Sequence, residues 1–198
     1  MDGDNWNTVF NLFHNPSRLY GIDFINSQIG FVVGSGLNGA SFIKTTNGGS
    51  NWSYNLVPFP AGLEFWDVHF KDENNGYVCG WNQYPTSFNN FGMIAKSTNG
   101  GETWTNIYTL DSARFSQFTF KNNIGYACGN INNRGVIIKT ADGGDSWAIQ
   151  RYFDTPLYKV FFVTDMVGFA LGSSGKIYKT IDGGGTIGIQ TISSEIPT

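Results

Sequence analysis

Residues that could carry out chemistry gather in one short stretch of the chain. Glu64, Asp67 and His69 are close together, at the start of a segment with alternating apolar residues. Carboxylates beside a single histidine can bind calcium or act as general acid and base. We therefore take Glu64, Asp67 and His69 as the candidate catalytic residues. Solvated loop charge is the simpler explanation of the same pattern.

A second group of residues could hold a ligand by stacking and charge. Trp81 and Tyr84 begin residues 80–92 (GWNQYPTSFNNFG), which we interpret as a long loop rich in aromatic residues. Such a loop can form a ligand platform, although its rings could instead cap the protein. Arg114 and Tyr158 stand near the starts of two later segments. We take Trp81, Tyr84, Arg114 and Tyr158 as the candidate ligand-binding residues.

Composition narrows the classes of partner and cofactor. The formal net charge is −3 and no basic run occurs, which argues against binding to nucleic acid. No apolar stretch reaches the ~20 residues of a membrane span. His14 and His69 are not at the spacing of zinc ligands, so no metal site is assigned. Calcium remains open as a cofactor.

The candidate residues lie within an internal repeat. Four segments share one pattern. Each begins with a strand of alternating apolar residues, a polar turn, and a second strand that opens with Gly and an aromatic residue. Each then has Lys-Thr or Lys-Ser, which is followed closely by Asn/Asp-Gly-Gly. The segments are residues 19–52, 65–104, 115–147 and 157–186. A period of ~40–50 residues with several strands per unit is typical of propeller blades. We predict an all-β protein, a β-propeller of four or five four-stranded blades.

The Asn/Asp-Gly-Gly turn has a mechanical explanation. A tight hairpin needs positive φ, which Gly and Asn supply at little cost. The Asn or Asp side chain can accept hydrogen bonds from the backbone and fix the turn. A Trp that follows in three of the four copies would bury a large apolar area beneath the turn. The fourth copy has Ile187 at this place.

These turns also resemble a known family. Residues 45–52, 97–104 and 140–147 are similar to the Asp box of bacterial neuraminidase repeats. The longer unit is similar to photosystem II assembly factor and sortilin-like propellers. The resemblance implies a propeller with Asp-box hairpins. It implies no single activity, because such propellers include sialidases, xyloglucanases, receptors and assembly factors.

The two ends of the chain suggest its boundaries and its location. Residues 2–6 look like the end of a box, so we predict a strand over residues 6–13 that pairs with the last repeat and closes the ring. Residues 188–198 are similar to the linker before a type nine secretion sorting domain, which implies export. They could equally form the last fourth strand. We therefore assign residues 1–186 to the propeller and 187–198 to a C-terminal strand or linker.

Two functions fit these observations. The first is an extracytoplasmic, secreted binding module for a protein or glycan ligand. The alternative is a calcium-dependent hydrolase, a lactonase or glycosidase that acts on a small ester, lactone or glycoside in the central funnel. Acidic residues converging on a deep funnel would favour the hydrolase, whereas an exposed aromatic patch would favour binding.

Overall fold

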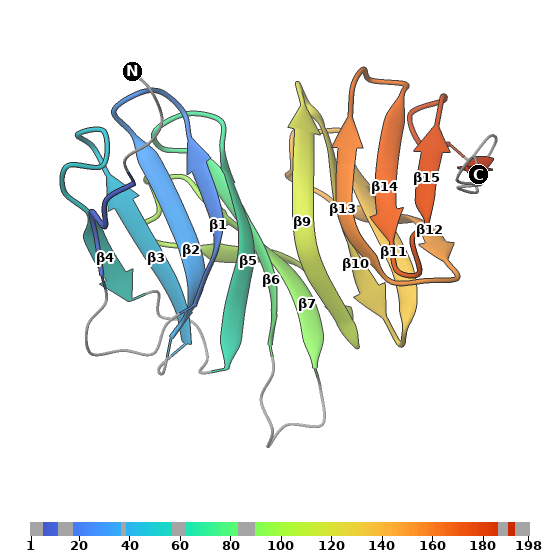
Figure 1. The fold of residues 1–198 in the computed structure, drawn as a ribbon, viewed down its shortest axis with the longest axis horizontal. Coiled ribbons are helices and arrows are strands. Elements are labelled where there is room, and N and C mark those ends of the chain that lie inside the picture. Colours follow the sequence, from blue (N-terminus) through green and yellow to red (C-terminus); the bar gives the residue numbers. More distant parts are fainter. Residues whose placement is uncertain are drawn as a thin grey trace.

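The computed structural model describes residues 6–11, 18–36, 39–56, 62–82, 90–185 and 190–192. Within these ranges all regular structure is β-strand, arranged as four antiparallel four-stranded sheets in chain order (Figure 1). The first two sheets are β1 (Arg18–Phe24), β2 (Gly30–Gly36), β3 (Gly39–Thr45), β4 (Ser53–Leu56) and β5 (Leu63–Phe70), β6 (Gly76–Asn82), β7 (Phe91–Ser97), β8 (Thr105–Asp111). The other two are β9 (Ala113–Lys121), β10 (Ile124–Ile131), β11 (Arg134–Thr140), β12 (Ala148–Phe153) and β13 (Leu157–Phe162), β14 (Gly168–Gly172), β15 (Ile177–Thr180), β16 (Gln190–Ile192).

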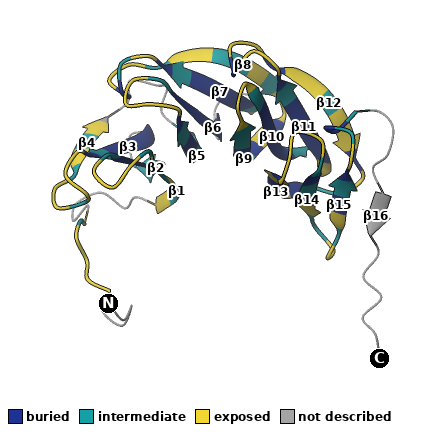
Figure 2. Ribbon diagram, turned by 90° about the horizontal axis from the view of Figure 1, so that it is seen from above, coloured by how far each residue is buried: buried dark blue, intermediate teal, exposed yellow. Residues whose placement is uncertain are grey.

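The sheets are the blades of a β-propeller. Each sheet is a meander, with its strands in sequence order, and the first strands β1, β5, β9 and β13 pack side by side. Seen from above, the four blades follow one another around an arc (Figure 2). The predicted fold class, all-β with four-stranded propeller blades, is confirmed.

Apolar faces hold successive blades together. Phe31 of the first blade stacks on Phe70 of the second, with ring centroids 3.6 Å apart. Tyr126 of the third blade stacks in the same way on Phe162 of the fourth, at 3.7 Å. Each pair lies within a cluster of buried residues drawn from two neighbouring blades. The first and second strands therefore supply the core between blades.

Among the described residues, apolar side chains of this kind are exposed at the two ends of the arc. Ile22 of β1 is 65% exposed, whereas Val68, at the corresponding place on β5, is only 4% exposed. At the other end, Leu171 and Ile177 of the fourth blade are also exposed. β1 does not pack against β13, and the arc is open between them (Figure 2).

The predicted closing strand over residues 6–13 is wrong for the part that the structure describes. Residues 6–11 form no strand, and Trp6 is 96% exposed. The fourth place in the last blade is taken by β16, which pairs antiparallel with β15. The C-terminal strand β16 thus occupies the edge of the last blade at which the N-terminal strand was expected. Residues 12 and 13 lie outside the described residues.

The Asn/Asp-Gly-Gly turns have the expected geometry. In the second blade both Gly100 and Gly101 have positive φ, at 69° and 88°. The Ser97 hydroxyl accepts a hydrogen bond from Gly101 N at 2.9 Å, and Asn99 Oδ1 accepts one from Thr103 N at 3.0 Å. Gly100 N donates to the carbonyl of Asn74 in the β5–β6 turn, at 2.9 Å. Each Asn/Asp-Gly-Gly turn therefore lies at the same end of its blade as the turn between the first and second strands.

In the first three blades, the lysine before the turn contacts the turn of the next blade, and in the second blade this lysine, Lys96, binds the carboxylate of Asp145. Lys44 of the first blade donates to the carbonyl of Gly100 in the second, at 3.3 Å. Lys139 of the third blade donates to the carbonyl of Gly183 in the fourth, at 3.1 Å, and the Tyr126 hydroxyl donates to the same oxygen at 2.8 Å. The repeated lysine and the repeated turn are thus parts of one contact between blades.

Candidate functional site

Every blade carries a β-bulge near the start of its first strand. In the second blade, Phe65 pairs with Gly80 and Asp67 with Cys79, which leaves Trp66 as the extra residue. The extra residues in the other three blades occupy the same position; they are Tyr20, Ser116 and Tyr158. A bulge turns its extra side chain away from the regular ladder and is frequent beside functional sites. The propeller thus presents four corresponding side chains in a row.

In three of the four blades, a glycine near the end of the second strand makes this bulge sterically feasible. A Cβ at Gly80 would lie 1.9 Å from the carbonyl oxygen of Glu64, and one at Gly129 would lie 1.9 Å from that of Arg114. Gly34 has the same relation to the carbonyl of Arg18. No side chain fits at these distances, so the repeated glycine of the sequence is explained by the bulge.

The row of bulge residues contains aromatic rings and one gap. Tyr20 and Trp66 stack with their centroids 4.5 Å apart and their planes 5° apart. Tyr158, on the fourth blade, is 52% exposed. Between Trp66 and Tyr158 the third blade has only Ser116, whose hydroxyl lies 3.4 Å from the carbonyl of Leu157. The small serine therefore leaves space between two aromatic side chains.

Arg114 borders the same space. Its guanidinium carbon lies 3.9 Å from the centre of the Trp81 ring, while Trp81 itself is buried at the end of β6. A guanidinium stacked on an aromatic face keeps its N–H groups at its edge, where they can bind a carboxylate or another acceptor. Arg114 is exposed, so these donors are accessible to solvent.

These groups surround a hollow of about 130 Å³ at the end of the blades opposite the Asn/Asp-Gly-Gly turns. It is lined by Trp66, Trp81, Arg114, Phe115, Ser116, Asn130, Leu157 and Tyr158. Three of the four predicted ligand-binding residues, Trp81, Arg114 and Tyr158, are therefore in one place. The fourth, Tyr84, lies outside the described residues. We call this space the bulge-row hollow.

Two of the predicted catalytic residues, Glu64 and His69, make local contacts within the second blade and its neighbours. Glu64 Oε2 accepts a hydrogen bond from the Trp66 indole at 3.2 Å, so this carboxylate orients a ring of the hollow. His69 stacks on Phe120, with centroids 4.9 Å apart, and its Nδ1 lies 3.4 Å from Asp23 Oδ2. Glu64 thus supports the bulge-row hollow, whereas His69 packs between blades.

Asp67 has a structural bond and an unusual pKa. Its Oδ2 accepts a hydrogen bond from the backbone N–H of Phe118 in the next blade, at 3.0 Å. Burial raises the pKa of Asp67 to about 6, against the lowering effect of its backbone hydrogen bonds. A carboxyl group with such a pKa can exchange a proton near neutral pH.

The same contact recurs one blade later. Gln117 occupies the place of Asp67 on β9, and its Oε1 accepts a hydrogen bond from Val160 N at 2.8 Å. The first blade has Gly21 there, where a Cβ would lie 2.8 Å from the Cα of Asp67. Asp67 and Gln117 thus connect neighbouring blades. Whether Glu64, Asp67 and His69 act in catalysis stays a prediction.

Five residues that line the hollow were not among the predicted site residues; they are Trp66, Phe115, Ser116, Asn130 and Leu157. Trp66 and Ser116 hold the same position in their repeats as Tyr158, which was predicted. Asn130 follows Gly129 near the end of β10 and lines the hollow from there. The repeat alignment could have identified Trp66 and Ser116, since the gap arises where one aromatic residue of four is replaced.

Two further features bear on the predicted cofactor and partners. Among the described residues, no group of three or more His, Cys, Asp or Glu side chains is placed to hold a metal ion. The same residues include no helix of the length and hydropathy needed to span a membrane.

Comparison with known proteins places the fold among propellers. No family model and no curated protein sequence matches the chain. Among solved structures, the chain is similar to YCF48 bound to D1 peptide, with 21% identity over 84% of this chain and 52% of that one, and a TM-score of 0.60. YCF48 from Cyanidioschyzon merolae has 19% identity over 92% of this chain and 59% of that one, with a TM-score of 0.62.

A propeller enzyme gives a similar match. The GH74 enzyme of Niastella koreensis has 20% identity over 84% of this chain and 28% of that one, with a TM-score of 0.62. The chain therefore spans between half and three-fifths of the two YCF48 structures and a smaller part of the enzyme. At this level of identity the matches establish the β-propeller fold, and they agree with the predicted similarity to photosystem II assembly factor propellers.

Proposed function

We propose that this propeller is an extracytoplasmic binding module that holds a protein or glycan ligand at the bulge-row hollow. The observation that carries the proposal is the interrupted aromatic row, in which Ser116 separates Trp66 from Tyr158. Aromatic walls with a few convergent polar groups are typical of ligand sites in concave surfaces. The hollow also lies at the end of the blades opposite the structural turns, so a ligand there would not compete with the contacts that hold the fold.

The chemistry of the lining restricts the ligand. Trp66 and Tyr158 offer flat apolar faces, against which a sugar ring or an apolar side chain can pack. Arg114 contributes a cation with directed donors, and Asn130 contributes an amide that can donate and accept. The described lining includes no carboxylate. A neutral or anionic ligand fits this set better than a cationic one.

The structural neighbours agree with both ligand classes. One YCF48 structure contains a D1 peptide, and one of the GH74 structures is a xyloglucanase from Xanthomonas campestris. The turns that resemble Asp boxes support the same propeller group, but they say nothing about the ligand. The proposal rests on the hollow of this chain.

The proposal is tested by a binding screen followed by matched variants. The 198-residue chain is screened against a panel of peptides and oligosaccharides, and the best ligand is titrated by calorimetry. Arg114→Ala should weaken binding by about ten-fold or more, the loss of one charged hydrogen-bonding contact. Arg134→Ala is the control, because Arg134 also lies over an aromatic ring, that of Tyr152, but outside the hollow. Equal affinity in both variants would contradict the proposal.

The raised pKa of Asp67 favours one second candidate, the calcium-dependent hydrolase. A carboxyl group with a pKa of about 6 is suited to donate a proton in ester or glycoside cleavage. A panel of lactones, esters and glycosides, assayed with and without calcium, tests this candidate. Activity that disappears in Asp67→Asn would support the hydrolase, and no turnover in the parent protein would exclude it for these substrates.

Export is the last part of the proposal, and it rests on the sequence of residues 188–198. These residues resemble the linker before a type nine secretion sorting domain. We expect the full protein to be found outside the cytoplasm when the cells that make it are fractionated. Recovery in the cytoplasm alone would remove this part of the proposal and leave the binding site unaffected.

A further inference from the structure

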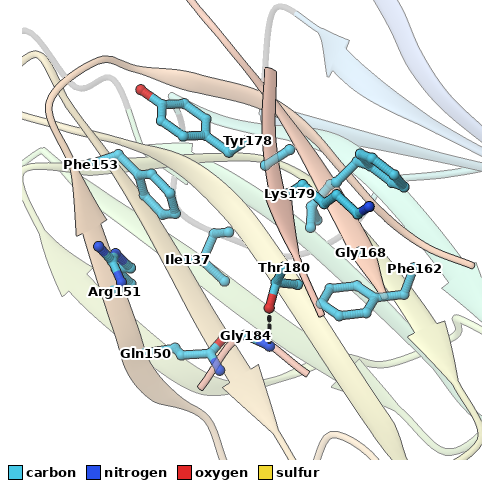
Figure 3. Close-up of a pocket in the computed structure, with 13 residues that line it drawn as sticks. Ile137, Gln150, Arg151, Phe153, Phe162, Gly168, Tyr178, Lys179, Thr180 and Gly184 are labelled. Carbon is cyan, nitrogen blue, oxygen red and sulfur yellow. Dashed lines mark hydrogen bonds between the residues drawn. The ribbon is translucent and has the colours of Figure 1, made fainter. Parts of the chain in front are cut away.

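The contacts between neighbouring blades are built from two matching halves. We call the first the lysine half: the aromatic residue that opens a blade's second strand, with the lysine opposite it on the third strand. In the first blade Phe31 and Lys44 form it, with Lys44 Nζ 5.5 Å from the centre of the Phe31 ring. In the third blade Tyr126 and Lys139 form it, at 5.2 Å. Tyr126 stacks on Phe162 of the next blade, which Figure 3 shows at this contact.

We call the second the tryptophan half: the phenylalanine at the end of a blade's first strand, the Asn/Asp-Gly-Gly turn and the tryptophan that follows the turn. In the second blade Phe70 and Trp104 have ring centroids 5.9 Å apart and planes at 84°. The lysine half of the first blade joins this tryptophan half directly. Phe31 stacks on Phe70, and Lys44 donates to the carbonyl of Gly100.

The fourth blade carries a lysine half on the side away from the third blade. Phe169 opens its second strand and Lys179 is opposite on β15, with Lys179 Nζ 5.9 Å from the centre of the Phe169 ring. This arrangement matches that of the first and third blades. The apolar neighbours of the pair on the same face are exposed; they are Phe161, Leu171 and Ile177.

The first blade carries a tryptophan half on the side away from the second blade. Phe24 and Trp52 have ring centroids 6.0 Å apart and planes at 90°, close to the 5.9 Å and 84° of the second blade. Gly48 in the turn has a φ of 66°, against 69° for the corresponding glycine of the second blade. Phe24 is 43% exposed, whereas its counterpart Phe70 is 2% exposed. This half is therefore built but not covered.

The indole nitrogen of Trp52 differs from its counterparts in the covered halves. Trp104 Nε1 and Trp147 Nε1 donate to glycine carbonyls of their own turns, at 3.0 and 3.1 Å. Trp52 Nε1 is buried without a hydrogen-bond partner among the described residues. The two paired indoles belong to blades that another blade precedes, whereas Trp52 belongs to the first blade. Because an unpaired buried N–H is unfavourable, a preceding blade that brought Trp52 into the same arrangement would stabilise this half.

Part of the N-terminal segment lies beside this tryptophan half. A hollow of about 190 Å³ is bordered by Thr8, Val9, Phe10, Leu19, Val32, Ile43 and Trp52. Val9 is exposed, and the hollow shows that residues 8–10 pack loosely on the blade. Ile22 and Phe24 do not line the hollow and are exposed. A blade that binds here therefore meets an open apolar surface and displaces only a loosely packed segment.

We propose that the lysine half of the fourth blade binds the tryptophan half of the first blade in a second copy of this chain. Phe169 stacks on Phe24 of the second copy, and Lys179 donates to its Gly48 carbonyl, as the first and second blades do within one chain. The occupant is a second copy because both halves stand ready at the two ends of the same arc (Figure 2).

Such a contact joins unlike surfaces, so it links copies head to tail. Two copies of four blades each, joined at both pairs of ends, close a ring of eight blades, which is within the range of propellers. The two ends lie apart from the bulge-row hollow, and the proposal does not depend on the proposed function.

One position departs from the pattern and sets the expected strength of the contact. Asp67 and Gln117 each accept a hydrogen bond from a backbone N–H of the next blade. Lys159 holds their place in the fourth blade, and a lysine side chain cannot accept such a bond. We therefore expect association to be weaker than the contacts within the chain and to appear as the protein concentration is raised.

Sedimentation velocity of the 198-residue chain at a series of concentrations tests the proposal. The parent should shift from the mass of one chain to that of two. Ile22→Glu damages only the tryptophan half and Leu171→Glu only the lysine half, and each should weaken association by about ten-fold or more. Both residues are exposed in the single chain, so both variants should fold. Ile149→Glu, at an exposed position of β12 away from both ends, is the matched control and should associate as the parent does.

A mixture of the two variants distinguishes unlike from like surfaces. Ile22→Glu retains the lysine half and Leu171→Glu retains the tryptophan half, so the mixture should form pairs that neither variant forms alone. A single-chain mass of the parent at every concentration would overturn the proposal and leave the two ends to another partner. Undiminished association of either variant alone would also overturn it, as would a mixture that stays monomeric.

Discussion

At the scale of single residues, the structure separates two kinds of polar residue that look alike in the sequence. Asp67 and Glu64 both vary between repeats and both stand near the starts of strands. Asp67 reaches the backbone of the next blade, whereas Glu64 holds the Trp66 ring. Sequence position alone could not distinguish these roles, because the partner of Asp67 is Phe118, far along the chain.

The pKa of Asp67 gives a prediction at this scale. Burial raises it from the ordinary 3.8 to about 6, so the folded protein binds an extra proton between these values and loses stability as the pH rises through them. Asp67→Asn keeps an oxygen for Phe118 N, as Gln117 keeps one for Val160 N. We expect the variant to be more stable than the parent above pH 6, by about 1–3 kcal/mol, and to lose this advantage near pH 4.

Urea denaturation of both proteins at several pH values measures this difference. Comparing the variant with the parent cancels the contributions of groups that both proteins share. A difference in unfolding free energy that is constant from pH 4 to pH 7.5 would mean that Asp67 does not titrate in this range.

At the scale of elements, the Asn/Asp-Gly-Gly turn followed by Trp supports the core between blades. Trp104 contacts Phe42, Phe65 and Phe70 and donates to its own turn. Trp104→Ala should therefore lower the free energy of unfolding by about 3–5 kcal/mol, as large aromatic truncations in cores do.

Ligand binding by the folded fraction of Trp104→Ala should be unchanged, since the bulge-row hollow is at the other end of the blades. Denaturation and calorimetry on the same sample measure both quantities. Weaker binding at an unchanged stability would show that the turns belong to the functional side of the molecule.

Much of this level of structure could be predicted from the sequence. The strands and the turns follow from residues that all four repeats share, such as the glycines with positive φ, and the tryptophan follows from the three repeats that have it. The bulge was not predicted, although the glycine that ends each second strand signals it. Its cause is a carbonyl oxygen 1.9 Å from an added Cβ at Gly80, a clash between strands that no local propensity expresses.

At the scale of the whole molecule, the four blades form an open arc. The sequence led us to expect that residues 6–13 would close the ring, and β16 instead completes the last blade. The repeat pattern alone does not specify which strand occupies the last edge, because a fourth-strand pattern stands at both ends of the chain. The exposed Ile22 and the buried Val68 hold the same place in two blades, which gives a matched test of the open end.

Val68→Ala should lower the free energy of unfolding by about 1–3 kcal/mol, because it removes buried methyl groups from the contact between the first and second blades. Ile22→Ala should change it by less than about 0.5 kcal/mol, as exposed substitutions do. Chemical denaturation of the two variants at low protein concentration makes the comparison. Equal losses would mean that the face of β1 is covered in solution.

The account's central claim is that the gap at Ser116 receives the ligand. Ser116→Tyr places in the third blade the ring that Tyr20 and Tyr158 provide at the same position, and it should fill the space between Trp66 and Tyr158. Thr119→Tyr adds the same ring to β9 outside the lining of the hollow and serves as the control. Calorimetric titration of the best ligand from the screen should show binding to the parent and to Thr119→Tyr, and about a ten-fold or greater loss for Ser116→Tyr. Undiminished binding by folded Ser116→Tyr would contradict the claim.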